Sequence, residues 1–579
     1  MSSKPVKQNA QSRLITLMAA EGVEAIYGIN DVFFHDFHRQ AEASGIHMIG
    51  PRHEAAAAMM ADAHTRMSGR SQACMAANGP GVMNLLPGIA IASFDNSPVV
   101  AVVSSRSMKA RTRPATGFFQ LAPQLEIFAP VTKYQATVTS AGQVDEIVHE
   151  AFRQANSGTP GPVFIEIPTD VMWEEARYGP APAPDTYRAA STAPPIAVVE
   201  SAARLLRAAK LPVILAGNAV KMSRSADALR QLARVLACPV INTWSGAGAF
   251  PETDSQLLRF GWGANDACSQ ADVVLAVGTS IGETLHFGQP PRWGAEDAQR
   301  WIHIERDAGK IGLNRKADVA LVGDLAEILP RLTEALEPLG PFRTPPQLAE
   351  WRAAQDATRR AWCDATTDAN PIHPGRAMMQ LASVTPEQSV VVRDGGCTKL
   401  WHTFLTELRG PDCLWSGHFG HLGVGIPFAV GASFATGKSR PILVVSGDGA
   451  FGFHAMELET AVRHRLPIVV VVNFDQQWGM ELVDFDPGEY DQIPDCRFSG
   501  SRLDGLATAL GAHGEYVDRL DELTPALQRA FAAGKPAVVQ IVTDSLINST
   551  ESALPCWEEF LSWWQADGYG YGLPGGAEA

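Results

Sequence analysis

The stretch Ser446-Gly447-Asp448-Gly449-Ala450-Phe451-Gly452 joins an apolar run, residues 441–445, to a segment with a helical pattern, residues 456–465. Glycines at such a strand-to-helix turn let backbone amides approach phosphate oxygens, and the start of the helix favours their negative charge. Asp448 in that turn would suit a hard divalent cation that bridges a diphosphate. Because tight turns also use the tripeptide Gly447-Asp448-Gly449 freely, this stretch alone is also consistent with a purely structural turn.

Further runs of β-branched residues alternate with helical segments rich in Ala and Leu along the chain. Most of these runs lack apolar/polar alternation, which favours parallel strands covered by helices on both faces. The predicted strands are residues 98–104, 162–167, 212–216, 273–278, 301–305, 389–393, 441–446 and 467–473. The pattern predicts an α/β protein with three doubly wound parallel-sheet domains in series.

Two segments rich in Pro and Ala, residues 178–195 and 336–347, interrupt this alternation. Proline removes a hydrogen-bond donor and fixes φ, so regular structure is not expected there. The predicted division of the chain is 1–180, 195–336 and 348–545, followed by a C-terminal tail at 546–579.

The composition narrows the class of protein. The chain has 579 residues, 46% of them hydrophobic, and a formal net charge of −15, which makes general binding to nucleic acid or to an anionic membrane a poor expectation. The eight Cys never form a CxxC pair, which favours a reducing compartment over a disulfide framework or a zinc site. The polar N-terminus lacks the apolar stretch of a signal peptide, so the prediction is a cytoplasmic protein.

The residues after the glycine-rich turn add a second signal. A Leu-Pro pair at 466–467 and another apolar run lead to Asn473-Phe474-Asp475-Gln476-Gln477-Trp478-Gly479-Met480-Glu481. Together with the turn at 447–449, this stretch resembles the cofactor signature of thiamine diphosphate enzymes. The resemblance implies Mg²⁺ held by Asp448, Asp475 and the backbone carbonyl of Gln477. This chain departs from the family at Asp475, where Asn is usual, and Asn473 is the alternative ligand.

A third signal lies near the N-terminus, where Pro51-Arg52-His53-Glu54 ends one predicted strand and opens an Ala-rich helix. Taken alone, Glu54 is a first-turn carboxylate that suits the helix dipole. In the family that this stretch resembles, the Glu contacts the pyrimidine ring of the cofactor and promotes loss of the C2 proton. The resemblance also places Gln120, in the run Gly117-Phe118-Phe119-Gln120, as a polar group that faces the reacting carbon.

The resemblance implies catalytic roles for Glu54, Gln120, His418, His421 and Glu481. It makes Leu422 the bulky residue that supports the bent cofactor, although ordinary core packing explains a Leu equally well. The alternative for His418, His421 and Glu481 is that each is an ordinary solvated side chain without a role at the site. The implied cofactor-binding residues are Gly396, Cys397, Thr398, His418, Gly420, Leu422, Gly447, Asp448, Gly449, Ala450, Asp475, Gln477, Trp478, Gly479 and Met480.

The order of these signals is similar to that of the acetolactate synthase-like branch, with pyrimidine-binding, central and diphosphate-binding domains. The resemblance implies a homodimer or homotetramer whose active sites form between subunits. Some relatives in this branch bind FAD between domains, and because this sequence contains no motif that demands it, FAD binding is left open.

The central domain carries Leu285-His286-Phe287-Gly288-Gln289-Pro290-Pro291-Arg292, which resembles 2-hydroxyacyl-CoA lyases and benzaldehyde lyase-like carboligases. We therefore expect cleavage of a 2-hydroxyacyl-CoA to an aldehyde or ketone plus formyl-CoA, or the reverse condensation. The candidates to contact the phosphates of coenzyme A are Lys109, Arg111, Arg113, Lys221 and Arg292. The alternatives are an acetolactate synthase-like carboligase or decarboxylase that uses free 2-oxo acids and, from another class, a nucleotide-binding scaffold without turnover.

The tail at 546–579 is rich in Trp and Tyr and ends in Gly and Pro. Two interpretations stay open for it. It is either an amphipathic helix packed on this or a neighbouring subunit, or a lid over the substrate channel.

Overall fold

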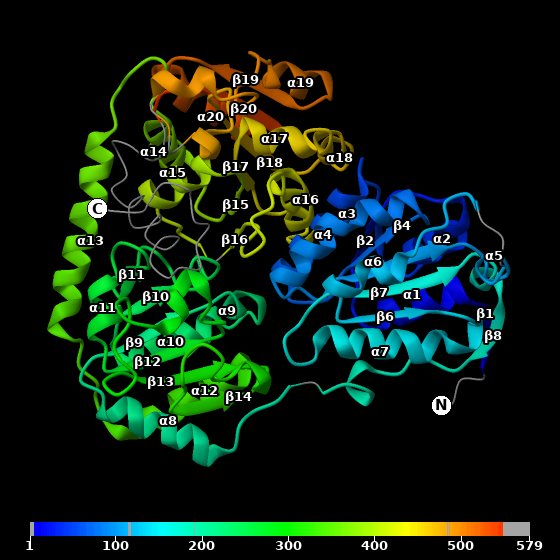
Figure 1. Cartoon of the computed structure of the whole chain (residues 1–579), viewed down its shortest axis with the longest axis horizontal. Helices are drawn as coiled ribbons and strands as arrows, with labels where there is room; N and C mark the ends of the chain where they lie inside the picture. Colours follow the sequence, from blue (N-terminus) through cyan, green and yellow to red (C-terminus); the bar gives the residue numbers. More distant parts are fainter. Residues whose placement is uncertain are drawn as a thin grey trace.

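In the computed structural model, the described residues are 5–113, 117–189, 191–410, 412–482, 485 and 487–547. The predicted aromatic tail therefore lies outside the described residues from position 548 onward. Three six-stranded parallel sheets with helices on both faces follow one another along the chain, which confirms the predicted fold class. In Figure 1 the N-terminal domain lies on the right, the central domain at the lower left and the C-terminal domain above it.

The N-terminal sheet has the strand order β3-β2-β4-β5-β7-β6, and a short antiparallel ribbon of β1 and β8 lies beside it. Its strands are β1 (Val6–Asn9), β2 (Ala25–Gly28), β3 (His47–Ile49), β4 (Ala73–Ala76), β5 (Val100–Ser105), β6 (Tyr134–Thr137), β7 (Val163–Pro168) and β8 (Glu175–Tyr178). Its helices are α1 (Ala10–Ala20), α2 (His35–Ala43), α3 (Glu54–Ser68), α4 (Pro80–Phe94), α5 (Met108–Arg111), α6 (Gln124–Phe128) and α7 (Val144–Asn156).

The central sheet has the order β11-β10-β9-β12-β13-β14. Its strands are β9 (Pro212–Ala216), β10 (Val240–Asn242), β11 (Leu257–Arg259), β12 (Val273–Val277), β13 (Arg300–Glu305) and β14 (Val319–Val322). Its helices are α8 (Ile196–Ala208), α9 (Ala219–Met222), α10 (Ala226–Leu236), α11 (Asn265–Gln270) and α12 (Leu325–Leu336).

The C-terminal sheet has the order β16-β15-β17-β18-β20-β19. Its strands are β15 (Val390–Arg393), β16 (Cys413–Leu414), β17 (Ile442–Gly447), β18 (Ile468–Phe474), β19 (His513–Val517) and β20 (Ala537–Val542). Its helices are α14 (Pro374–Val384), α15 (Cys397–Leu405), α16 (Gly425–Ala435), α17 (Asp448–His454), α18 (Glu457–Arg463), α19 (Leu503–Ala509) and α20 (Leu520–Ala532).

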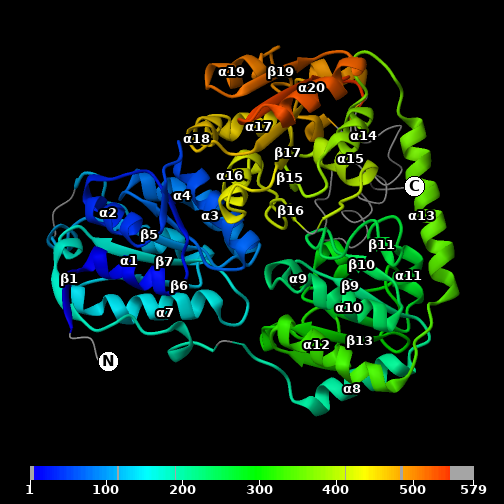
Figure 2. The ribbon, with the colours of Figure 1, turned by 180° about the vertical axis from the view of Figure 1, so that it is seen from behind.

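A long helix, α13 (Pro346–Ala365), links the central and C-terminal domains and runs along the outer edge of both in Figures 1 and 2. Leu348 and Trp351 pack into the core of the central domain, whereas Trp362 packs into the core of the C-terminal domain. The sequence analysis assigned this segment to the last domain. The apolar side chains of α13 instead belong to two cores, so the helix fixes one domain against the other.

Helix α3 is rich in Ala because it packs between two other helices. One is α4 of its own domain, and the other is α16 of the C-terminal domain. A Cβ at Gly88 of α4 would lie 2.5 Å from the Cβ of Ala58, and a Cβ at Gly431 of α16 would lie 2.2 Å from the carbonyl oxygen of Met60. Small residues on all three helices therefore let the backbones approach closely. This packing holds the N-terminal domain against the C-terminal domain within one chain.

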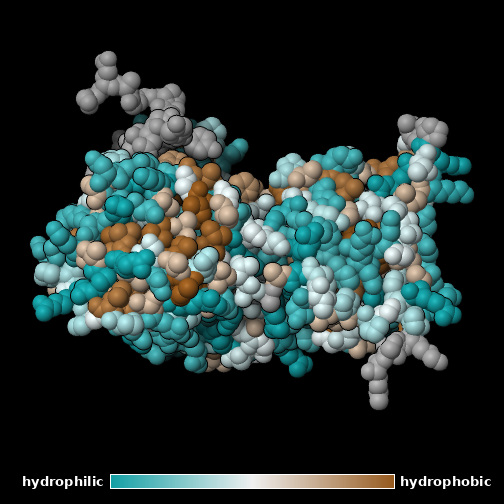
Figure 3. All heavy atoms as spheres, turned by 90° about the horizontal axis from the view of Figure 1, so that it is seen from below, coloured by the Kyte–Doolittle hydropathy of each residue, from teal (hydrophilic) through white to brown (hydrophobic). Residues whose placement is uncertain are grey.

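The face of the molecule in Figure 3 is mainly hydrophilic, with apolar residues gathered on the side of the central domain. No helix within the described ranges combines the length and the apolar character that crossing a membrane would take.

Candidate active site

Two carboxylates stand at the carboxyl ends of neighbouring parallel strands, β17 and β18. Asp448 follows β17 and Asp475 follows β18, because both strands are apolar runs that end at the same edge of the sheet. The amides of Gly449 and Gln476 each donate a 2.8 Å hydrogen bond to Asp448. The two turns that the sequence analysis selected are thus brought together.

Both carboxylates are poorly solvated, and this changes their acidity. Burial raises the pKa of Asp448, and the nearby Asp475 carboxylate raises it further. Burial likewise raises the pKa of Asp475, against the opposing effect of backbone hydrogen bonds. Two like charges in a desolvated turn are unfavourable unless a proton or a cation is shared between them.

Glycines in the surrounding turns let neighbouring side chains pack directly against the backbone. A Cβ at Gly449 would lie 2.5 Å from the ring of Trp478, and one at Gly396 would lie 2.0 Å from Cγ of Met480. Gly396 caps α15, so Cys397 and Thr398 stand at the start of that helix. The turns at 395–398, 447–450 and 475–480 therefore lie against one another at one edge of the sheet.

The loop from residue 416 to residue 423 completes this edge. Asp394, at the end of β15, accepts hydrogen bonds from the amides of Gly423 and Gly425 at 3.0 and 2.9 Å. The amide of His421 donates to Ser416 Oγ at 2.9 Å, while Leu422, next to it, is partly buried. Gly420 has a φ of 66°, a backbone conformation that favours glycine in such a turn.

His418 faces the N-terminal domain rather than the edge formed by residues 447–449. Its Nδ1 lies 3.8 Å from Oδ1 of Asp95, and its amide donates to the same carboxylate. Glu481 lies within the turn of 3₁₀-helix at Gly479–Leu482 and has an exposed side chain. The structure therefore brings His421 and Leu422 beside the diphosphate-type turns and places His418 at a contact between domains.

Glu54 and Gln120 lie together on the N-terminal domain, on either side of the turn at residues 77–81. Asn84 Nδ2 donates a 3.0 Å hydrogen bond to Glu54, and a Cβ at Gly81 would lie 3.1 Å from Oε1 of Glu54. Asn78 Nδ2 donates to the carbonyl of Gln120 at 3.0 Å. No hydrogen bond or ion pair among the described residues of this one chain joins Glu54 or Gln120 to Asp448 or Asp475.

The start of α3 is instead tied to the C-terminal domain through a different side chain. Glu457 of α18 accepts hydrogen bonds from the amides of Arg52 and His53 at 2.9 and 3.1 Å. Sequence reasoning missed Glu457. As the first residue of a helix it resembles many solvated carboxylates, yet its side chain is almost wholly buried.

A cavity of about 230 Å³ opens at the central domain between β9 and β12, where the strand order reverses. Its lining includes Gly278, Glu305, Arg306 and Lys310, and it extends to Asp95 and His418. A topological switch point of this kind is the usual place for a ligand in an open parallel sheet. The sequence analysis predicted the strand at 301–305 but did not single out Arg306 or Lys310.

Two of the cations that the sequence analysis offered for phosphate contacts are already engaged. Lys221 Nζ donates to the carbonyls of Ala247 and Cys413, each at 3.0 Å, and Arg111 forms an ion pair with Glu166. No group of three or more His, Cys, Asp and Glu within the described ranges has the arrangement of a metal site made by protein side chains alone. A cation at Asp448 and Asp475 would therefore need ligands from a bound molecule.

Three parallel-sheet domains, with a diphosphate-type turn in the last and a Glu-led helix in the first, define the architecture of thiamine-dependent enzymes. Comparison with known families agrees. Residues 8–127, 199–332 and 394–541 match the N-terminal, central and C-terminal domains of thiamine pyrophosphate enzymes, the outer two being described as binding domains for that cofactor. The chain belongs to this family, as the sequence analysis predicted.

Relatives with different activities are similar over nearly the whole chain. The chain is 28% identical to 2-hydroxyacyl-CoA lyase 1 of Mus musculus, covering 91% of this chain and 92% of the relative. It is 31% identical to the sulfoacetaldehyde acetyltransferase of Castellaniella defragrans, with the same coverage. It is 30% identical to a probable acetolactate synthase large subunit of Methanocaldococcus jannaschii, covering 92% of this chain and 91% of that one. The chain is thus a thiamine diphosphate-dependent enzyme of the acetolactate synthase-like branch.

Proposed function

We propose that this enzyme is a carbon–carbon lyase that cleaves a 2-hydroxyacyl-CoA into an aldehyde or ketone and formyl-CoA, with Mg²⁺ beside its thiamine diphosphate. The observation that carries the proposal is the cavity at the central domain. It extends from Arg306 and Lys310 to His418, at the loop that borders the predicted cofactor site. A substrate with a long nucleotide-bearing arm would use both ends of such a cavity, whereas a small 2-oxo acid would not.

The residues present fit the cofactor and its metal. Asp448, Asp475 and the carbonyl of Gln477 would hold Mg²⁺, because hard cations prefer oxygen ligands and two buried like charges need a counter-charge. The turns at Gly396 and Gly449 would receive the diphosphate, because each stands at the start of a helix, where backbone amides favour phosphate oxygens. Leu422 would support the middle of the cofactor.

Bound thiamine diphosphate supplies the nucleophilic carbon that adds to a carbonyl. The chain supplies orientation and proton transfer around it. Glu54, which is held by Asn84, would bind a ring nitrogen of the cofactor. His421 and Glu481 would move the proton of the substrate hydroxyl, and Gln120 would present its amide to the substrate oxygen.

The coenzyme A part of the substrate would lie at the switch point of the central sheet. Lys310 and Arg306 can contact phosphate oxygens, although Arg306 also pairs with Asp324 at 3.0 Å. Glu305, whose pKa is raised by burial, stands at the end of β13, where an acidic residue can accept hydrogen bonds from ribose hydroxyls. The adenosine moiety of FAD would compete for the same place.

A homodimer is the smallest competent unit in this proposal. Within one chain, Glu54 lies beside Asn84, while Glu457 ties the preceding residues to α18. Glu54 would thus complete the site of a second subunit, and a tetramer would contain two such pairs. We extend the proposal to a cytoplasmic enzyme that binds no nucleic acid.

A substrate panel tests the proposal. The purified protein, supplied with thiamine diphosphate and Mg²⁺, is incubated with 2-hydroxyacyl-CoAs and, in parallel, with free 2-oxo acids. Formation of formyl-CoA from the first group supports the lyase. Turnover of free 2-oxo acids alone, or flavin absorbance in the purified protein, would favour the acetolactate synthase-like alternative.

A further inference from the structure

A small cavity of about 50 Å³ lies between the central and C-terminal domains, separate from the two sites described above. Trp244, Phe260 and Trp262 line it from the central domain, and Arg393, Lys399 and Trp415 line it from the C-terminal domain. Arg393 directly precedes the loop that starts at Asp394, and Trp415 directly precedes the loop that starts at Ser416. The cavity therefore adjoins both loops that border the predicted cofactor site.

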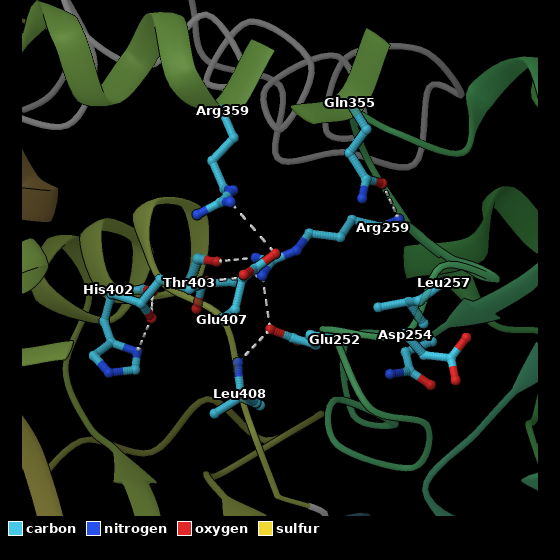
Figure 4. A network of polar contacts seen from close by, with 12 residues as sticks. Glu252, Asp254, Leu257, Arg259, Gln355, Arg359, His402, Thr403, Glu407 and Leu408 are labelled. Carbon is cyan, nitrogen blue, oxygen red and sulfur yellow. Dashed lines mark hydrogen bonds and ion pairs between the residues drawn. The ribbon is translucent and has the colours of Figure 1, made fainter. Parts of the chain in front are cut away.

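One of the cations at this cavity is fully compensated. Arg259 Nη2 lies 2.8 Å from Glu252 Oε2, and the same guanidinium donates to the carbonyls of Thr403 and Thr406 at 2.7 Å. Figure 4 shows this network, with Glu407 facing Arg359 above it. Glu252 also accepts from the amide of Leu408 at 2.8 Å. Arg259 and Glu252 thus balance each other and bind the two domains together.

Arg393 has no such counter-charge among the described residues. Its side chain is 96% buried, Nε lies 3.2 Å from His402 Nδ1, and Nη2 has no hydrogen-bond partner in the described part of the chain. Burial and the charges of Arg393 and Arg259 hold the pKa of His402 well below its ordinary value, so this ring offers a lone pair and no charge. An unpaired buried guanidinium is costly unless something occupies the space beside it.

Lys399 adds a second positive charge that no carboxylate in the described residues pairs with. Its Nζ lies 4.4 Å from the centroid of the Trp415 ring. Asp394, the nearest acid along the chain, instead accepts hydrogen bonds from the amides of Gly395, Gly423 and Gly425. The lining thus carries three cations, Arg259, Arg393 and Lys399, and one carboxylate, Glu252. Because Glu252 compensates Arg259, the charges of Arg393 and Lys399 are left without a counter-charge from the described lining.

We propose that this cavity is a binding site for a small inorganic oxyanion such as phosphate, held by Arg393 and Lys399 between the central and C-terminal domains. A volume of about 50 Å³ admits a small ion together with little water and excludes a nucleotide. Charge-assisted hydrogen bonds from a guanidinium and an ammonium are the chemistry that recognises such an anion. Because the lining comes from two domains, bound anion stabilises their contact.

The test uses the full-length holoenzyme, saturated with thiamine diphosphate and Mg²⁺ so that added phosphate cannot enter the diphosphate-binding turns. Inorganic phosphate is titrated at constant ionic strength while the melting temperature is followed. Gluconate, which is too large for the cavity, serves as the control anion. We expect a saturable rise in melting temperature with phosphate and none with gluconate. A wild-type protein that shows no saturable phosphate effect overturns the proposal.

Variants locate the site. Lys399→Met and Arg393→Met should each weaken the phosphate midpoint by about tenfold or more, as loss of a charged hydrogen-bond donor does. The matched control is Lys438→Met, because Lys438 Nζ lies 5.0 Å from the ring of Phe434 on the surface of the same domain. An unchanged midpoint in Lys399→Met contradicts the assignment.

If Arg393→Met does not fold, acetylation of Lys399 in the wild-type holoenzyme decides the matter. Phosphate should slow modification of Lys399, measured by peptide mass spectrometry, relative to Lys438 in the same sample. Equal rates for Lys399 with and without phosphate would overturn the proposal.

Discussion

The backbone amide of Gln476 lies 2.8 Å from Oδ2 of Asp448, so the turn after β18 is held directly against the turn after β17. This hydrogen bond fixes which residue of the second turn stands beside Asp448. Asp475 is the adjacent carboxylate, and its charge raises the pKa of Asp448. Asn473 lies two residues earlier, still within β18 and buried, with an Oδ1 that has no partner among the described residues.

We predict that Asp475→Ala raises the Mg²⁺ concentration needed for half-maximal activity by at least roughly tenfold, the lower end of what losing even an outer ligand partner costs. The reason is that one of few protein oxygens on the cation disappears. Activity measured against Mg²⁺ at saturating thiamine diphosphate checks this. Asn473→Ala is the comparison variant, and if it proves the more damaging of the two, the assignment of Asp475 is wrong.

A glycine pair on α17 offers a sharper test of the diphosphate turn. Gly449→Ala would place a Cβ 2.5 Å from the ring of Trp478, whereas Gly452→Ala on the same helix meets nothing within 4 Å. We expect the first change to displace Trp478 and lower cofactor affinity. The second should leave affinity unchanged and slightly stabilise the helix, by about 0.5–1 kcal/mol. Titration of thiamine diphosphate by tryptophan fluorescence measures the affinity of both variants.

Glu54→Gln is expected to leave cofactor binding intact and to reduce turnover by roughly 100- to 10,000-fold, the usual contribution of a positioned acid–base group. An amide cannot supply the charge that Glu54 would present to the cofactor ring. The exchange rate of the C2 proton of bound thiamine diphosphate, followed by NMR, reports this directly. Glu42→Gln on the exposed end of α2 is the control. Wild-type exchange in Glu54→Gln would remove Glu54 from its proposed role.

The three-sheet architecture was predictable because several strands of each sheet are short unbroken apolar runs, such as residues 467–473; strands such as β6 and β19, which carry polar residues, were not predicted. The turns at 447–449 and 475–480 were also found, since glycine and carboxylate at strand ends are local signals. Contacts between domains were not predictable in this way. Asp95, Glu252 and Arg393 each look like surface residues in the sequence, and only the packing of one domain on another makes them buried.

Asp95 provides a prediction about that packing. It accepts hydrogen bonds from Arg66 Nη2 at 2.7 Å and from the amide of Gly417 at 3.1 Å, so it ties α4 to the loop at 416–423. We expect Asp95→Ala to lower the free energy of unfolding by about 3 kcal/mol, as the loss of one partner of a buried ion pair does. Asp227→Ala, which removes an exposed pair with Arg230, should cost less than about 1 kcal/mol. Urea unfolding of the two variants makes the comparison.

The pH dependence of the ion pair between Asp95 and Arg66 follows from the pKa of Asp95. Burial opposes ionisation of Asp95, but Arg66 and His418 outweigh it and hold the pKa at about 2. Because the folded-state pKa lies below the ordinary value of 3.8, the stabilisation is fully present above pH 3.8 and is lost as the pH falls toward 2. The difference between wild type and Asp95→Ala should therefore shrink only in strong acid. A difference that already vanishes near neutral pH would show that the carboxylate charge contributes nothing.

The proposed anion site should have its own pH dependence, governed by Lys399. Burial and the neighbouring charge of Arg393 lower the pKa of Lys399 to about 8, although Asp394 and the Cys397 thiol oppose this shift. Since only the protonated amine attracts an anion, affinity should be full below pH 8 and should fall as the pH rises through that value. Sulfate is the suitable probe because, unlike phosphate, it does not titrate in this range. Its binding midpoint is measured on the holoenzyme by melting temperature from neutral to alkaline pH.

Arg393 keeps its charge throughout, so some binding should persist at high pH, and Lys399→Arg should remove the decline. A midpoint that does not change with pH in the wild type would exclude Lys399 from the site.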